Sequence, residues 1–62
     1  MNSLLLAVTD FAMQQCHREE DLLAWGVMNA LALEGLRPEL RAAVRQQYLA
    51  RRAILRARAD AA

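Results

Sequence analysis

The chain has 62 residues, of which 56% are hydrophobic and 24% are charged, and its formal net charge is +1. This length allows one small domain, and the many hydrophobic residues together with only two Gly and one Pro exclude an intrinsically disordered chain. Ala, Leu, Arg, Glu and Gln dominate and β-branched residues are few, which predicts an all-α fold. The basic residues are all Arg, as is typical of GC-rich genomes, and we expect a bacterial or bacteriophage origin.

A first helix is predicted over about residues 3–33, roughly 45 Å long at 1.5 Å per residue. The polar segment around residues 14–21 contains neither Gly nor Pro, and this favours one continuous helix. The alternative is a break near 17–21 that gives three helices, with Asp21 or a neighbouring residue as the N-cap of the middle one.

An apolar stripe runs along the beginning of this helix at helical spacing. It is predicted to be part of the core, and the alternative is an exposed arm that docks on a partner. Its members are Leu4, Leu5, Val8, Phe11 and Ala12.

Residues 22–33, LLAWGVMNALAL, place large apolar side chains on every side of the helix. Twelve residues are too few to cross a bilayer, which needs about 20, so no membrane insertion is expected. A helix that is apolar all round must be buried, and one antiparallel neighbour covers only one stripe. The segment therefore predicts a homodimeric four-helix bundle, and the alternatives are a compact three-helix monomer or an obligate complex with another protein. Its predicted self-association residues are Leu22, Leu23, Gly26, Val27, Asn29, Ala30 and Leu31.

Two residues of this segment have more specific predicted roles. Gly26 permits close approach of a second helix. Asn29 either fixes the register of the bundle from a buried position or points to water near a helix end.

The strongest helix-ending signal is the segment Glu34–Pro38. Gly35 is predicted to take the left-handed conformation that ends a helix, with Leu36 folding back on the last turn. Pro38 suits the first position of the next helix, with Glu39 near its positive end. A link this short predicts an antiparallel helical hairpin.

The second helix is predicted over about residues 38–58, with fraying through 59–62. Four arginines form a stripe bordered by Tyr48, while Arg51 and Arg58 lie toward the apolar side, where they cover apolar surface or meet the acidic residues 19–21. The stripe consists of Arg41, Arg45, Arg52 and Arg56. The apolar sector predicted to face the first helix consists of Leu40, Ala43, Val44, Ala50, Ile54, Leu55 and Ala57.

Catalytic chemistry has little support in the sequence. Cys16 and His17 are the only Cys and His, and adjacent helical residues point about 100° apart, so they cannot act as a nucleophile–base pair. We expect no enzyme, no metal site and no cofactor, and we predict Cys16 to be a small buried hydrophobic residue. A single Cys excludes an internal disulfide framework and favours a cytoplasmic location.

The favoured function is a protein–protein interaction module that binds, and by occupying a surface inhibits, a larger protein such as a transcription regulator or enzyme. The alternative is nucleic-acid binding through the arginine stripe. Residues 35–62 carry seven Arg and two carboxylates, which suits a polyanionic partner. Against it, residues 1–34 carry one Arg and five carboxylates, and this acidic half would repel a polyanion. The predicted partner-binding residues are Phe11, Trp25, Met28, Tyr48, Arg41, Arg45, Arg52 and Arg56.

Overall fold

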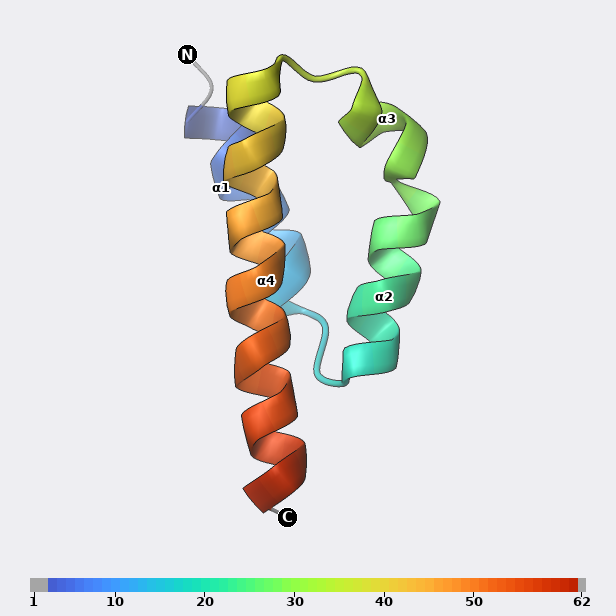
Figure 1. The fold of residues 1–62 in the computed structure, drawn as a ribbon, viewed down its shortest axis with the longest axis vertical. Helices are drawn as coiled ribbons and strands as arrows, with labels where there is room; N and C mark the ends of the chain where they lie inside the picture. Colours follow the sequence, from blue (N-terminus) through green and yellow to red (C-terminus); the bar gives the residue numbers. More distant parts are fainter. Residues whose placement is uncertain (1–2, 62) are drawn as a thin grey trace.

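The computed structural model describes residues 3–61, and every regular element in that range is an α-helix (Figure 1). The helices are α1 (Ser3–Gln14), α2 (Glu19–Met28), α3 (Ala30–Glu34) and α4 (Pro38–Ala61). The predicted all-α fold is confirmed. Within the described range, no helix has both the length and the hydropathy needed to cross a bilayer.

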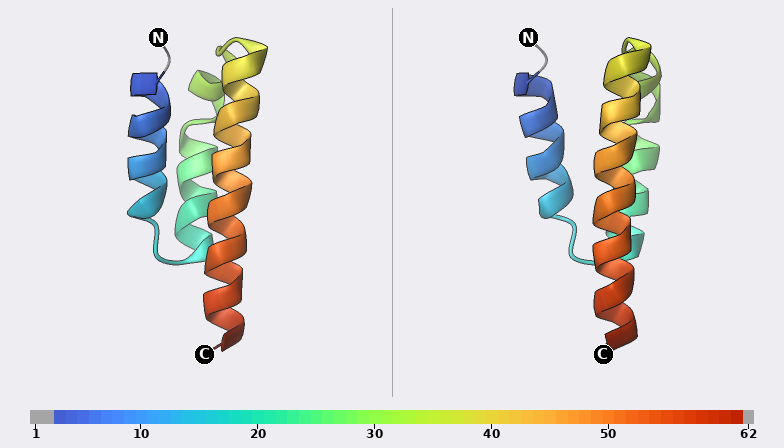
Figure 2. Two further views of the ribbon diagram at one scale, coloured as in Figure 1. Left: turned by 90° about the vertical axis from the view of Figure 1, so that its left-hand side faces the viewer. Right: turned by 60° about the vertical axis from the view of Figure 1, so that its left-hand side comes forward.

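Helix α4 is the axis on which the other helices pack. Helix α1 lies along one side of it and runs in the same direction, and the chain then reverses so that α2 and α3 return along another side (Figures 1 and 2). The molecule measures 38 × 20 × 17 Å, and the last turns of α4 extend past the α1–α2 connection (Figure 2). The segment α2–α3 is therefore antiparallel to α4.

The prediction of one continuous helix over residues 3–33 is wrong, because the chain leaves the helical conformation between Gln14 and Glu19. Breaking here lets α1 and α2 both pack on α4, which a straight helix of this length could not do. The N-cap of α2 is Arg18, with φ −133° and ψ 153°, and not Asp21. Asp21 lies in the first turn of α2 with two glutamates, where negative charge is favourable beside the positive end of the helix dipole.

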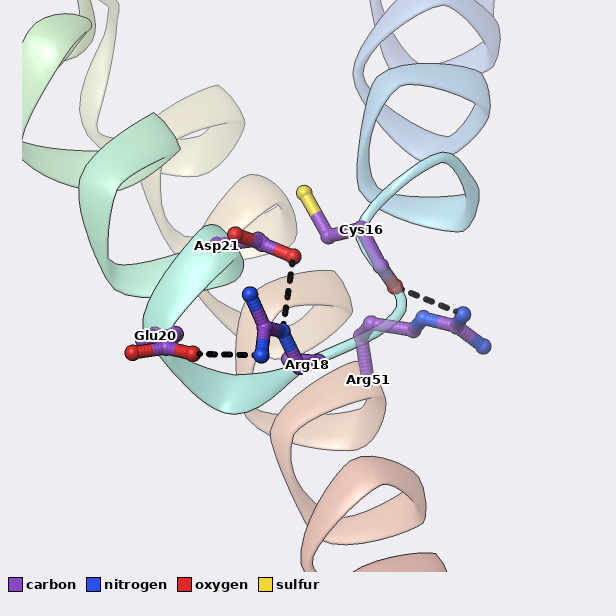
Figure 3. A network of polar contacts seen from close by, with 5 residues as sticks. All are labelled: Cys16, Arg18, Glu20, Asp21 and Arg51. Atoms are coloured by element: carbon purple, nitrogen blue, oxygen red, sulfur yellow. Dashed lines mark hydrogen bonds and ion pairs between the residues drawn. The ribbon is translucent and has the colours of Figure 1, made fainter.

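Arg51 of α4 supplies hydrogen bonds to the end of α1. Its Nη2 donates to the backbone oxygen of Cys16 at 2.8 Å (Figure 3). The same Nη2 donates to the backbone oxygen of Gln14 at 3.4 Å, and the residue is only 6% exposed. Carbonyls in the last turn of a helix lack intrahelical donors, and a cation is favourable beside the negative end of the dipole. Of the two alternatives predicted for Arg51, the side chain is buried on the apolar side of α4, and its hydrogen bonds go to Gln14 and Cys16 and not to the acidic residues 19–21.

A second, unpredicted interruption occurs at Asn29, between α2 and α3. Asn29 has φ −106° and ψ 7°, and both its backbone N–H and its side-chain Nδ2 donate to the carbonyl of Trp25, at 3.1 and 2.8 Å. The side-chain amide competes with the backbone for the same acceptor, as Asn commonly does. Asn29 thus bonds to its own helix, and it is half-buried.

The turn before α4 differs from the prediction at Gly35. This residue has φ −77° and ψ −5°, so the predicted left-handed conformation is wrong. The turn is tightened instead by two i→i−3 hydrogen bonds, from Gly35 N–H to the Ala32 oxygen (3.3 Å) and from Leu36 N–H to the Leu33 oxygen (3.2 Å).

Helix α4 begins at Pro38 with Glu39 in its first turn, as predicted. It continues to Ala61, beyond the predicted end at about residue 58. The fraying expected over residues 59–62 stays a prediction, and residue 62 lies outside the described residues. Arg58 lies in its last turn, where the helix dipole favours a cation.

The core lies where α1, α2 and α4 meet, and it is small. The predicted burial of Cys16 is confirmed. The buried apolar residues of the core are Met13, Cys16, Leu22, Val44 and Leu55, packed against partly buried Leu6, Trp25, Leu33, Leu36 and Tyr48.

The buried face of α4 is rotated relative to the predicted sector. Val44 and Leu55 are buried as predicted, but Ala50, Ile54 and Ala57 are exposed. Half-buried Gln47 and Tyr48 and buried Arg51 take their place toward α1 and α2.

Candidate interaction surfaces

Helix α1 is held against α4 by polar contacts in addition to the burial of Met13 in the core. The Thr9 hydroxyl donates to Oε1 of Gln47 at 2.6 Å, and Nε2 of Gln47 donates to the backbone oxygen of Leu6 at 2.9 Å. Arg51 closes the other end of the same helix. Thr9 and Met13 occupy the buried side of α1. The apolar stripe of α1 therefore lies on the side of the helix that faces away from the core.

Large hydrophobic side chains are exposed on all four helices. The predicted core role of the α1 stripe is wrong for its most exposed members, which do not reach the interior of this chain. The exposed large hydrophobic residues are Leu4 (75%), Val8 (56%), Phe11 (67%), Leu23 (59%), Val27 (69%), Met28 (84%), Leu31 (86%) and Ile54 (44%).

One apolar surface is a groove of about 220 Å³ between α1 and the α2–α3 segment. We call it the groove surface, and Trp25 lies in it, half-buried. Its polar groups, Thr9 and Asn29, already have hydrogen-bond partners within the chain. The residues that line it are Leu5, Val8, Thr9, Ala12, Trp25, Asn29, Ala32, Leu33 and Leu36.

A second surface lies between α2 and α4, and we call it the arginine surface. It is a hollow of about 360 Å³ in which Leu23 and Tyr48 lie between acidic and basic side chains. Nε of Arg56 contacts Oε2 of Glu19 at 2.7 Å. The lining residues are Glu19, Glu20, Leu23, Tyr48, Arg52 and Arg56.

The close approach predicted at Gly26 occurs within the chain. A Cβ atom at this position would lie 3.2 Å from Cε2 of Tyr48, so the absence of a side chain brings α2 near the ring. Tyr48 is thereby seated beside Leu23, where both line the arginine surface.

The predicted self-association residues are divided by the fold. Leu22 is completely buried in the core of its own chain, and Gly26 faces Tyr48. Ala30 and Leu31 of α3 are exposed, as are Leu23 and Val27 of α2, and of these only Leu23 lines the arginine surface. The segment 22–31 therefore does not form one continuous contact surface.

The predicted partner-binding residues are divided as well. Phe11 and Met28 are exposed and Trp25 lies in the groove surface, whereas Tyr48, Arg52 and Arg56 line the arginine surface. The remaining two arginines of the stripe are exposed on α4. Of these, Arg41 donates from Nη1 to the Glu34 backbone oxygen at 3.2 Å, and Arg45 lies one turn farther along.

The groups with potential for metal or nucleophilic chemistry lie near the α1–α2 connection. Sγ of Cys16 is buried and lies 3.7 Å from the Ala12 oxygen, while His17 is exposed. In the part of the chain that the structure describes, no three His, Cys, Asp or Glu side chains are grouped so as to hold a metal ion.

Comparison with known proteins gives no relative: no protein-family model, no curated protein and no solved structure matches this chain.

Sequence reasoning did not identify Thr9, Gln47 and Arg51 as the residues that position α1. The available signal was Gln47 and Arg51 at i, i+4 spacing within the apolar sector of α4. Polar side chains in such a sector indicate acceptors on the opposing helix, because buried polar groups are hydrogen-bonded.

Proposed function

We propose that this protein is a non-enzymatic interaction module that binds a larger protein, such as a regulator or an enzyme, and inhibits it by occupying part of its surface. The arginine surface is the proposed contact site. In this proposal the protein acts as a homodimer, so that each assembly offers two copies of the site.

The observation that carries the proposal is the apolar surface that the fold leaves exposed. Leu23, which lines the arginine surface, is 59% exposed, and Val27, one helical turn farther along the same face of α2, is 69% exposed. Contiguous exposed apolar surface on a small protein marks an interaction site, because solvating it costs free energy that a partner relieves.

The arginine surface has the composition of a binding site for a protein. Tyr48 and the arginines belong to the residue types that dominate interface energetics. Leu23 supplies an apolar centre, and Arg52 and Arg56 form a polar rim with Glu19. A rim carrying both charge signs favours an apolar partner surface that also carries both signs.

The same mixture disfavours nucleic acid as the partner. Glu19 and Glu20 lie beside Arg52 and Arg56, and the Glu19–Arg56 contact offsets one of the charges that would bind phosphate. A polyanion would meet repulsion next to each attraction.

Quantitative co-purification tests the proposal. Tagged wild type, Leu23→Glu and Ile54→Glu are passed through a lysate of the source organism, with and without nuclease. Ile54 is the matched control, because it is also an exposed aliphatic residue of the helical surface but lines neither the groove surface nor the arginine surface. We expect wild type and Ile54→Glu to retain the same stoichiometric protein with or without nuclease, and Leu23→Glu to lose it.

Equal recovery by Leu23→Glu, or no stoichiometric protein with wild type, would contradict the proposal. Loss of all binding after nuclease treatment would support nucleic acid instead. Circular dichroism of each variant verifies that the helices are intact.

A further inference from the structure

The groove surface and the exposed stripe of α1 have complementary chemistry. Leu4, Val8 and Phe11 follow i, i+4, i+7 spacing and therefore lie on one face of α1. Their exposed fractions are 75%, 56% and 67%. The stripe adjoins the groove, because Val8 belongs to both. A helix that carries such a stripe is the shape of ligand that an apolar groove between helices accepts.

Charge restricts the occupant to an uncharged helix face. Among the described residues, no charged side chain lines the groove. A charged group placed there would lose its hydration without gaining a partner. Helix α1 meets this requirement: Asp10 is its charged residue, and at 100° per residue it lies about 100–160° around the helix from the stripe.

The surface area is larger than expected for an isolated chain of this mass. A folded 7.0 kDa monomer is expected to expose about 4,000 Å², whereas this chain exposes 4640 Å². The excess of roughly 600 Å² approaches the ~800 Å² that each partner buries in a standard interface. An interface with a second copy of the chain is therefore large enough to cover this excess surface.

We infer that the groove surface binds α1 of a second copy of this chain, in a twofold arrangement in which each α1 lies in the groove of the other. The contact is isologous, because each α1 is both a wall of its own groove and the occupant of its partner's groove. Hydrogen bonds from Gln47 and Arg51 hold α1 in place, so its stripe is presented without rearrangement. The inference rests on the proposed function, since both require the exposed apolar surface to be an interaction surface.

This arrangement buries Trp25, the only tryptophan of the sequence, and leaves the arginine surface free for a larger partner. Dimerisation should therefore be visible in tryptophan fluorescence as well as in mass. Emission should move to shorter wavelength as concentration rises, because water leaves the indole ring.

The test is sedimentation equilibrium with parallel tryptophan fluorescence on wild type, Phe11→Glu and Val27→Glu. Phe11 and Val27 are 67% and 69% exposed, so the two substitutions are matched in exposure but lie on different surfaces. We expect wild type and Val27→Glu to have twice the 7.0 kDa chain mass. Phe11→Glu should weaken dimerisation at least about 30-fold, the loss that a hot-spot aromatic side chain produces, and should shift the emission to longer wavelength.

A monomeric wild type at about 100 µM, a concentration at which even weak homodimers of standard interface size form, would overturn the inference. So would a dimer that Val27→Glu dissociates and Phe11→Glu does not. If Phe11→Glu loses helical circular dichroism, Leu4→Glu provides the same test on a side chain that is 75% exposed.

The two proposals fail separately. A dimer that survives Phe11→Glu, together with a partner lost only in Leu23→Glu, refutes the groove contact and leaves the proposed function standing. A groove dimer that captures no partner refutes the proposed function alone.

Discussion

Helices α2 and α4 distribute their apolar residues in opposite ways. In α4, Val44 and Leu55 are buried on one side, and the arginine stripe occupies another. In α2, only Leu22 of ten residues is buried, while Leu23, Val27 and Met28 point away from the core. An amphipathic helix such as α4 needs one neighbour, whereas a helix apolar on several sides needs more than this chain supplies.

The difference indicates a division of roles. Helix α4 is the scaffold, because α1 and α2 both pack on it and its polar side chains position α1. Helix α2 supplies contact surface in two directions, toward the groove through Trp25 and toward the arginine surface through Leu23. Substitutions at the buried positions of α4 should therefore affect folding, and substitutions at Leu23 of α2 should affect partner binding.

The largest expected effect is at Leu22, compared with its neighbour Leu23. Leu22→Ala removes a completely buried side chain and should destabilise the fold by about 3–5 kcal/mol, enough to unfold a domain of this size. Leu23→Ala should change stability by less than about 0.5 kcal/mol, because that side chain is 59% exposed. Urea denaturation followed by circular dichroism measures both, at a concentration where association is absent. Equal losses would contradict the assignment of Leu22 to the core and Leu23 to the surface.

The second largest loss of stability is expected at Arg51 of α4, compared with its neighbour Arg52. Arg51→Met should cost about 2 kcal/mol, because the carbonyls of Gln14 and Cys16 lose their donor. Among the described residues Arg51 Nε has no hydrogen-bond partner. We therefore expect the loss of stability to fall in the lower part of the range for hydrogen bonds to charged groups. Arg52→Met is the control and should change stability by less than about 0.5 kcal/mol. The difference should appear in denaturation midpoints and in faster amide exchange in α1; similar midpoints would show that Arg51 does not hold α1.

The smallest effect is expected at Gly26. Alanine favours a helix by about 1 kcal/mol over glycine, but its Cβ would lie 3.2 Å from Tyr48 Cε2. We expect the two effects to offset, so that Gly26→Ala changes stability by less than about 0.5 kcal/mol. In a Tyr48→Ala background, the same substitution should stabilise by about 1 kcal/mol. A double-mutant cycle in urea measures the difference, and additive effects would show that the ring does not restrict Gly26.

Local signals in the sequence predicted the start of α4 well. The preference of Pro38 and Glu39 for the first turn of a helix depends only on that turn, and both residues lie where predicted. The α1–α2 break was not predicted as the favoured alternative, because the donor that completes the end of α1 is Arg51, 35 residues away from Cys16. Helical propensity contains no information about such a distant partner.

The candidate surfaces were predicted in composition but not in arrangement. The excess of apolar residues in 22–33 was evident from periodicity, and several of its large side chains are exposed. Their grouping depends on the break at residues 15–18, which brings Trp25 opposite α1 and places Leu23 beside Tyr48. A single continuous helical wheel could not show that grouping.

The hydrogen bonds that position α1 end largely on main-chain oxygens, those of Leu6, Gln14 and Cys16. Every amino acid carries such an oxygen, so these hydrogen bonds place no requirement on the side chains of α1, in contrast to the buried Thr9 and Met13. Substitutions at the outward residues of α1 should accordingly leave the backbone beneath them in place and change only what the helix binds. Substitutions at residues 4, 8 and 11 should therefore change the binding specificity of α1 without any change to the rest of the molecule.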